Sequence, residues 1–313
     1  MTITQLKYVL AVAEHQNFTK AAAHVFVTQP TLSMQIQKLE EELSILIFDR
    51  SKKPIELTEV GEKIVNQARN IVNESERMQD VVDQEKGFIG GDFRLGIIPT
   101  VMPTLLPMFL KSFIKKYPKV HLKIEELTTA EIIIKLNDGH LDAAIAATPL
   151  VQEKIKERVL YFEPFVGYVP INHRLSSKKY LDRSDLDIND ILLLEDGHCF
   201  RDGVINICKS LKHNSATDSF QVESGSFETL IKLSNEGFGM TLLPYLHTLD
   251  IPKGEQKKYL RYFNEPSPAR EVSLLYRKSE LKMQIIDSLY DIIASIIRGA
   301  ITFQNVKIIS PLR

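Results

Sequence analysis

The sequence contains no tryptophan and only two cysteines among its 313 residues. Two cysteines exclude the disulfide-rich scaffolds of small secreted proteins. No stretch approaches the ~18 consecutive apolar residues of a membrane-spanning helix. The first residues, MTITQLKYVLAVAEH, are too polar and too periodic for an export signal. We therefore expect a cytoplasmic protein without a membrane partner, whose two thiols stay reduced unless they take part in redox chemistry.

The chain also lacks an excess of charge, because 39 Lys and Arg side chains face 40 Asp and Glu side chains and the net charge is -1. Binding of nucleic acid would therefore have to come from a local patch. We find no phosphate-binding loop, no G-x-S-x-G elbow, and no H-x-x-x-H or C-x-x-C spacing. The sequence thus predicts neither a cofactor nor a metal site. Its length allows two or three domains.

The first sixty residues read as short amphipathic helices. Thr19 is predicted to cap the second helix, while Thr28 caps the third and Pro30 fits its first turn. Leu32, Ile36, Leu39 and Leu43 form the buried stripe of this third helix. Its remaining face suits the major groove of DNA, where amides and hydroxyls can read base edges. The candidate reading residues are Gln29, Pro30, Thr31, Ser33, Met34, Gln37 and Lys38.

The segment after this helix reads as a hairpin with a basic tip. Its candidate phosphate contacts are Arg50, Lys52 and Lys53. Residues 1–57 hold six basic and six acidic side chains, so binding would depend on geometry and dimerisation more than on charge. Taken alone, the third helix could equally be an amphipathic helix with a solvated polar face.

The stretch FTKAAAHVFVTQPTLSMQIQKLEEELSILIFDR, followed by LTEVGE, resembles the winged helix-turn-helix of LysR-type transcriptional regulators. The resemblance implies a DNA-binding domain over residues 1–58, a double-stranded DNA operator as partner and RNA polymerase as a second partner. It also implies a regulator rather than an enzyme.

Residues 59–91 are predicted to form a linker helix and a glycine hinge. A heptad seam of Ile64, Ala68, Ile71, Ser75, Met78 and Val82 predicts pairing with a second copy of the chain. GFIGGD then ends the helix. The alternative is a single long helix that packs on its own domain. A dimer suits the DNA reading, and the family resemblance implies a homotetramer.

From residue 92 onward, strands alternate with helices, which predicts an α/β fold with mainly parallel sheets. The sequence resembles the regulatory part of LysR-type proteins, built like a periplasmic binding protein from two subdomains. We place subdomain I at about 92–162 and 269–300, and subdomain II at about 163–268. Residues 301–313 form a tail outside the resemblance. Thr100 and Thr129 follow predicted strands and are candidates for a ligand cleft, although each could instead cap a helix.

Both cysteines lie in LLLEDGHCFRDGVINICKS. A helix that begins near His198 would separate Cys199 from Cys208 by about 13.5 Å of rise and place them on opposite faces. A disulfide needs Cα atoms within about 7 Å, so bonding would require local refolding. His198, Arg201 and the helix N-terminus favour a thiolate at Cys199 and predict a pKa below the usual ~8.5. Cys208, in VINIC, reads as buried and inert. Two unpaired core cysteines are the alternative.

The segment LLLEDGHCFRDGVINIC is similar to the redox loop of peroxide-sensing LysR members, and GIIPT, LTTAE and AREVSLLYR match in register. The resemblance implies that hydrogen peroxide is the signal, that Cys199 reacts with it and that Cys208 resolves the product into a disulfide. It implies a glutaredoxin- or thioredoxin-type thiol reductant for the return step. Phe200 and Gly203 depart from the family's loop.

The same resemblance implies a peroxide pocket around Cys199. In it, His198 would orient or polarise, Thr100 and Thr129 would hydrogen-bond the peroxide, and the remaining pocket residues would be Arg201, Asp202 and Arg270. Arg270 would stabilise both the thiolate and the departing oxygen. Two other functions remain open: a LysR-type regulator that binds a small metabolite, and a thiol peroxidase.

Overall fold

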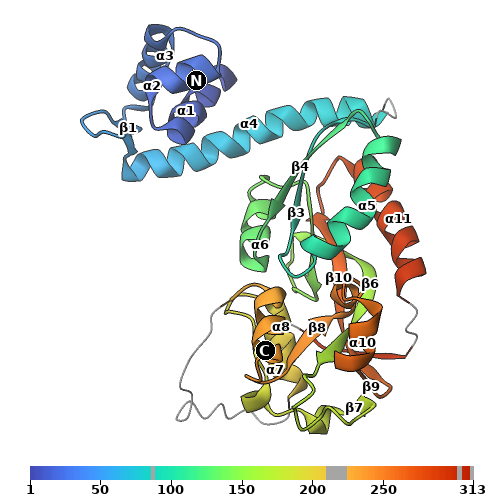
Figure 1. The fold of residues 1–313 in the computed structure, drawn as a ribbon. Coiled ribbons are helices and arrows are strands. Elements are labelled where there is room, and N and C mark those ends of the chain that lie inside the picture. Colours follow the sequence, from blue (N-terminus) through green and yellow to red (C-terminus); the bar gives the residue numbers. More distant parts are fainter. Residues whose placement is uncertain (86–88, 209–223, 302–304, 311–313) are drawn as a thin grey trace. The chain divides into compact units, whose positions relative to one another are not determined.

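The computed structural model describes residues 1–85, 89–208, 224–301 and 305–310. The chain divides into two compact units, Met1–Phe88 and Ile89–Arg313, which are described separately (Figure 1). The finer boundaries predicted at residues 58, 91, 162, 268 and 300 remain predictions. Within the described part of the chain, no helix combines the length and the hydrophobicity that crossing a membrane requires.

The first unit is a winged helix-turn-helix followed by a long helix. Its elements are α1 (Ile3–His15), α2 (Phe18–His24), α3 (Gln29–Leu43), β1 (Phe48–Asp49), β2 (Glu56–Leu57) and α4 (Glu59–Glu85). Thr28 caps α3 as predicted. The prediction that Thr19 caps α2 is wrong, because the side chain of Asn17 accepts hydrogen bonds from the backbone of Thr19 and Lys20. An asparagine at this position satisfies two free N–H groups at once.

The first half of helix α4 packs in the core of its own unit. Val65, Ala68 and Val72 are buried there, against side chains from α1 to α3. The prediction that Ala68 faces a second copy is therefore wrong, since heptad spacing cannot tell which surface covers an apolar side chain. Ile71, near the middle of α4, and Met78, Val81 and Val82 further along are exposed, so an apolar strip runs along α4 from its middle onward.

The second unit is built on a mixed sheet whose main path runs β4-β3-β5-β10-β6-β9-β7, with β11 beside β10 and β8 beside β6. The strands are β3 (Gly91–Ile97), β4 (Val120–Glu126), β5 (Ala143–Thr148), β6 (Ile155–Tyr168), β7 (Tyr180–Leu181), β8 (Thr241–Pro244), β9 (Leu260–Phe263), β10 (Ser267–Arg277) and β11 (Val306–Ile308). The helices are α5 (Met102–Lys116), α6 (Thr129–Asn137), α7 (Cys199–Ile207), α8 (Phe227–Asn235), α9 (Tyr245–Thr248), α10 (Lys253–Tyr259) and α11 (Met283–Ala300), with short 3-10 turns at Arg183–Asp185 and Ile188–Asp190.

Two long strands connect the two halves of this unit (Figure 1). β3 is parallel to both β4 and β5, but β10 is antiparallel to β5 and to β6. The expectation of mainly parallel pairing therefore holds for β3 to β5 and fails at the centre of the sheet. A chain that crosses into the second half and returns needs one strand in each direction, so β6 and β10 run antiparallel.

The unit has two separate apolar cores, which we call core I and core II. Core I lies around β3, β4, β5, α5, α6 and α11, and core II lies around the far end of β6, α7, α8, β8 and β9. The tail is not free, because β11 pairs in parallel with β10 and Ile309 is buried in core II. Its Ser310 carbonyl accepts a hydrogen bond from the Asn206 amide at 3.0 Å, so the tail touches the helix that begins with Cys199.

Candidate functional site

Helix α7 separates the two cysteines as predicted. Cys199 is its first residue, His198 is its N-cap and Cys208 is its C-cap. Both thiols are free. Cys199 packs against core I, whereas Cys208 is buried in core II. The helix therefore holds its two thiols in different hydrophobic environments.

The thiol of Cys199 meets the carboxyl ends of the parallel strands. Thr129 begins α6 after β4, and Ala147 lies near the end of β5. Both residues favour the thiolate of Cys199 through the Thr129 hydroxyl and the Ala147 backbone. Thr129 Oγ1 is nevertheless buried and makes no hydrogen bond of standard geometry in the described part of the chain. This hydroxyl therefore has spare capacity for a small polar ligand.

The two threonines are not helix caps, which settles the alternative left open by the sequence. Thr128 caps α6 through a capping box with Glu131, so the hydroxyl of the next residue, Thr129, is released from that role. Helix α5 has Val101 at its N-cap position and no side-chain cap. The hydroxyl of Thr100 instead accepts a hydrogen bond from Arg270 Nη1 at 2.8 Å.

Arg270 is the buried cation of the site, with 3% of its surface exposed. Its Nε and Nη2 donate to Glu163 Oε2 at 2.9 and 2.7 Å, and Nη2 also donates to the Thr100 carbonyl at 3.1 Å. Arg270 on β10 and Glu163 on β6 are cross-strand partners. Glu163 Oε1 in turn accepts from the backbone N–H of Leu246 at 2.9 Å. The charge of Arg270 is thus fixed in place by a buried pair.

The predicted lowering of the Cys199 pKa is wrong for this state of the molecule. Burial raises the pKa of Cys199, although Arg270, Thr129 and Ala147 each work in the opposite direction. Burial has the larger effect because a thiolate loses more solvation than a thiol. Asp202, in the first turn of α7, raises the pKa slightly further.

The cation that favours the thiolate is Arg270, as the family resemblance implies, and not Arg201, which the local sequence favoured. The Arg201 guanidinium donates to the Leu194 carbonyl at 2.8 Å and pairs with Asp196 at 2.8 Å, so it braces the loop before α7. His198 Nε2 lies 3.4 Å from Glu195 Oε1. Charges adjacent in sequence are here directed away from Cys199, and the opposing charge comes from Arg270 on a distant strand.

Phe200 and Gly203, the two residues that depart from the family's loop, both lie beside the Phe165 ring. Phe200 lies 4.9 Å from Phe165 and 5.1 Å from Phe227 between ring centres, and the Arg270 guanidinium lies 5.1 Å from its ring centre. A Cβ atom on Gly203 would come within 3.0 Å of Phe165. The glycine therefore makes room for the aromatic cluster that lies beneath the arginine.

Cys208 lies in the apolar core II. It is 6% exposed. Burial and the charge of Asp187 raise its pKa to about 11, against a weaker opposing effect of Arg183. The Arg183 guanidinium donates to the carbonyls of Asn206 and Ile207 at 2.9 and 3.3 Å and so holds the end of α7. The prediction that Cys208 is buried is confirmed, and its surroundings disfavour the thiolate.

Glu163 and Ala147 are the site residues that the sequence analysis missed. Glu163 stands alone in the apolar run YFEPFVGYV. An acidic side chain in a strand of that kind usually needs a buried partner, and this was the available signal. Ala147 acts through its backbone, so its side chain carried no signal.

The predicted DNA-reading residues lie on one accessible side of α3. Gln29, Pro30, Thr31, Met34, Gln37 and Lys38 are exposed and Ser33 is half-buried. On the hairpin of β1 and β2, Lys52 and Lys53 are exposed. Arg50 is occupied instead: its Nη2 lies 2.7 Å from Glu40 Oε2 and its guanidinium lies 5.2 Å from the centre of the Phe18 ring. The structure thus gives Arg50 a role in attaching the wing to α3.

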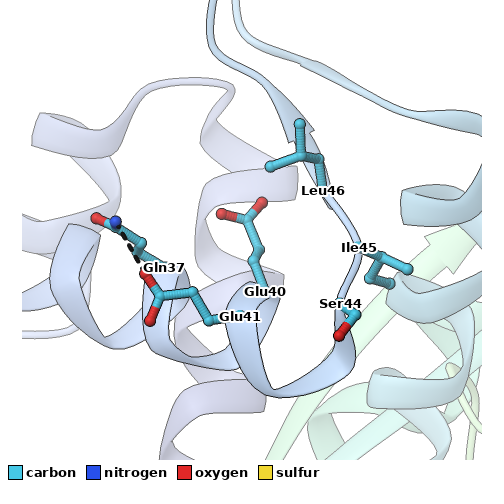
Figure 2. Close-up of a pocket in the computed structure, with 6 residues that line it drawn as sticks. All are labelled: Gln37, Glu40, Glu41, Ser44, Ile45 and Leu46. Atoms are coloured by element: carbon cyan, nitrogen blue, oxygen red, sulfur yellow. Dashed lines mark hydrogen bonds between the residues drawn. The ribbon is translucent and has the colours of Figure 1, made fainter.

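A shallow hollow of about 330 Å³ lies at the end of α3, lined by Gln37, Glu40, Glu41, Ser44, Ile45 and Leu46 (Figure 2). Glu40 Oε1 accepts from the backbone of Ile47 and Phe48 at 2.8 and 3.2 Å. The hollow therefore marks the corner where α3 is tied to the wing, and it belongs to the first unit rather than to the cysteine site.

Known families match almost the whole chain. The LysR substrate binding domain matches residues 86–295, and the bacterial regulatory helix-turn-helix of the lysR family matches residues 3–62. The DNA-binding transcriptional dual regulator OxyR of Escherichia coli is 33% identical over 277 residues, which cover 88% of this chain and 90% of that protein. A probable hydrogen peroxide-inducible genes activator of Streptomyces viridosporus is 30% identical over 308 residues, covering 98% and 97%. That likeness extends past residue 300, so the expectation that the tail lies outside the resemblance is wrong.

Solved structures of LysR-type proteins also match this chain. A full-length OxyR variant from Pseudomonas aeruginosa matches with a TM-score of 0.75 and 33% identity, over 94% of this chain and 98% of that one. A hydrogen-peroxide-bound OxyR variant from Corynebacterium glutamicum matches with a TM-score of 0.64 and 27% identity, over 96% and 93%. The chain belongs to the LysR family of bacterial transcriptional regulators, and within it to the relatives of the hydrogen peroxide-inducible genes activators.

Proposed function

We propose that this LysR-type regulator senses hydrogen peroxide through Cys199 and activates transcription of antioxidant genes after a disulfide forms with Cys208. The thiolate of Cys199 attacks one peroxide oxygen, the O–O bond breaks, and hydroxide leaves with the electron pair. The sulfenic acid that remains condenses with the thiol of Cys208, which forms the S–S bond and releases water. In sum, two thiols and one peroxide give one disulfide and two waters.

The observation that carries this proposal is the position of Cys199 between a fixed cation and an unpartnered hydroxyl. Arg270 favours the thiolate electrostatically, and its side chain is held by Glu163 and Thr100. Thr129 Oγ1 is buried without a standard hydrogen bond in the described part of the chain, and its hydroxyl can donate one to peroxide. Preorganised donors of this kind stabilise the charge that develops on the leaving oxygen.

The second step requires α7 to unfold. Nine residues of helix separate the two Cα atoms by about 13.5 Å, whereas a disulfide accepts about 7 Å at most. Since Cys199 contacts core I and Cys208 lies in core II, the bond must pull one thiol out of its core. Oxidation thereby converts a local covalent change into a rearrangement of the second unit.

The first unit supplies the DNA contacts in this proposal. The exposed side of α3 reads base edges, and Lys52 and Lys53 contact phosphates, while Arg50 positions the wing through Glu40. The apolar strip Ile71, Met78, Val81 and Val82 on α4 pairs with a second copy. The further partners proposed are a second dimer, RNA polymerase, and a thiol reductant of the glutaredoxin or thioredoxin type that returns the disulfide to two thiols.

The decisive experiment exposes three full-length proteins to a short pulse of micromolar peroxide and measures the mass of the cysteine-containing peptides. We expect the unmodified chain to form the Cys199–Cys208 disulfide and Cys199→Ser to remain unoxidised. Cys208→Ser should stop at a sulfenic acid on Cys199 that a dimedone probe captures. A sulfenic acid on Cys208 of the Cys199→Ser variant, or regulation of transcription by peroxide in that variant, contradicts the assignment.

A further inference from the structure

Three potential metal ligands converge at the ends of two helices in the first unit, far in sequence from the cysteines. Glu14 and His15 are the last two residues of α1, and His24 is the last residue of α2. One ligand atom from each lies within 4.8 Å of the other two. No metal site is expected from the sequence, and the spacing of nine residues between these two histidines matches no common motif.

The arrangement of the two imidazoles fits a shared ion. Their ring centres are 4.8 Å apart and the planes are inclined by 59°. With Zn–N distances of about 2.0–2.1 Å, two imidazoles on one tetrahedral ion have ring centres about 5 Å apart. Two histidine nitrogens and one carboxylate oxygen are also a common donor set for zinc, with a fourth position left for water.

An independent observation indicates that His15 is available to bind an ion. The Nε2 atom of His15 is buried and has no hydrogen-bond partner in the described part of the chain. Buried polar atoms are normally paired, so a lone one calls for a physical reason. A histidine at a helix C-terminus often complements the partial negative charge there. That role explains each histidine separately, but it explains neither their approach nor the unpartnered nitrogen.

The electrostatic setting and the access also suit a cation. The C-terminal ends of α1 and α2 both carry partial negative charge, and Glu14 adds a full one. Glu14 and His24 are exposed while His15 is half-buried, so an ion can enter from solvent. The exposed side chains can rotate the short distance needed to close the coordination shell.

We propose that Glu14, His15 and His24 bind one divalent transition-metal ion of the zinc type. The ion links the end of α1 to the end of α2. The next residue, Gln16, accepts a backbone hydrogen bond from Ile55 in the wing at 3.3 Å. Metal binding thus stiffens the corner between α1 and α2, next to the point where the wing contacts Gln16.

The test uses the untagged full-length chain carrying Cys199→Ser and Cys208→Ser, because free thiols also bind zinc. Zn²⁺ binding is measured by calorimetry, and Co²⁺ binding is measured through its visible absorption bands, which report coordination geometry. We expect one ion per chain and a higher thermal midpoint with Zn²⁺. Loss of an outer-shell partner already weakens metal binding about 10–100-fold, so His24→Ala and Glu14→Gln should weaken it at least about tenfold.

The matched control is His121→Ala, which removes an exposed histidine from β4 in the second unit and should leave binding unchanged. His24 and Glu14 are exposed, so their variants should fold, and the thermal midpoint without metal checks this. Equal affinity in His24→Ala and His121→Ala overturns the proposal, as does a stoichiometry well below one ion per chain. No peroxide enters the assay, so its result is independent of the proposed cysteine chemistry.

Discussion

The two ends of α7 are chemically opposite although they belong to one short helix. At its start, Cys199 has a buried arginine, the hydroxyl of Thr129 and a backbone group around its thiol. At its end, Cys208 lies among apolar side chains, and burial together with Asp187 raises its pKa to about 11. The contrast shows how much the rest of the unit contributes to the surroundings of each thiol, in addition to the opposite partial charges at the two ends of the helix.

This contrast depends most strongly on the Arg270–Glu163 pair. Removing one member of a buried ion pair typically costs about 3–5 kcal/mol, because the other charge remains unpaired. We expect Arg270→Met to lower the free energy of unfolding by that amount and to slow alkylation of Cys199, with little effect on Cys208. Urea unfolding under reducing conditions and alkylation followed by mass spectrometry provide the two measurements.

The control is the double variant Arg270→Met with Glu163→Met. If the pair acts as proposed, the double variant recovers much of the lost stability, because no buried charge remains, yet Cys199 stays slow. Recovery of thiol reactivity in the double variant would refute the role of Arg270 as the cation that favours the thiolate.

Alkaline pH should reveal how the buried thiol of Cys208 contributes to the free energy of unfolding. Burial first, then Asp187, raises the pKa of Cys208 from 9.0 to about 11. The unfolded chain therefore loses this proton near pH 9 while the folded chain keeps it. The stabilisation is complete below pH 9 and is lost as pH rises toward 11, by about 2–3 kcal/mol in total.

The measurement is the free energy of unfolding between pH 8 and 11, compared between the unmodified chain and Cys208→Ala with reductant present. Other groups titrate in both proteins, so only the difference in slope reports on Cys208. Parallel curves would show that the surroundings of Cys208 do not disfavour its thiolate.

Local patterns in the sequence predict the helix between the cysteines, whereas Arg270 and the two threonines of the site were expected only through the family resemblance. Helix α7, its N-cap at His198 and the burial of Cys208 follow from local patterns. Arg270 and Glu163 are 107 residues apart and meet only because β6 and β10 pair in one register. The local pattern of charge instead indicated Arg201 as the cation near Cys199, but Arg201 forms an ion pair with Asp196. Pairing across a sheet is a property of the assembled fold, so a single sequence does not reveal it.

The first unit shows the same division between local and tertiary information. The α3 stripe of Leu32, Ile36 and Leu39 is buried as its spacing predicts. The seam on α4 was assigned to a second copy, yet Ala68 packs within its own unit. Periodicity identifies which residues share a face, whereas only tertiary packing decides which surface covers that face.

The two threonines of the site should respond in opposite ways to the same substitution. Thr100→Val removes the acceptor of a 2.8 Å hydrogen bond from Arg270 and should cost about 1–3 kcal/mol, because a buried charged donor loses a partner. Thr129→Val removes an unpartnered hydroxyl, so stability should be unchanged or slightly higher. Peroxide oxidation of Cys199 should nevertheless slow by about 100–1,000-fold when a positioned hydrogen-bond donor is lost.

Unfolding curves and stopped-flow oxidation rates test both variants together. A Thr129→Val protein that loses stability but oxidises at the normal rate would reverse the assignment, because the hydroxyl would then have a structural role only.

The smallest expected effect concerns the far end of α7, where the tail contacts it. Asn206→Ala removes the 3.0 Å hydrogen bond to the Ser310 carbonyl, which should cost about 0.5–1.5 kcal/mol. Since α7 must unfold before the disulfide can form, loss of this contact should raise the rate of disulfide closure after the sulfenic acid has formed, without changing the first reaction with peroxide. Rapid-quench mass spectrometry resolves the two steps. The control is Asn189→Ala at an exposed turn, where the Asn189 amide donates to the Asp187 carboxylate. If both variants close the disulfide at the same rate, the tail does not restrain the helix, and the difference between the two ends of α7 then lies in the thiol surroundings alone.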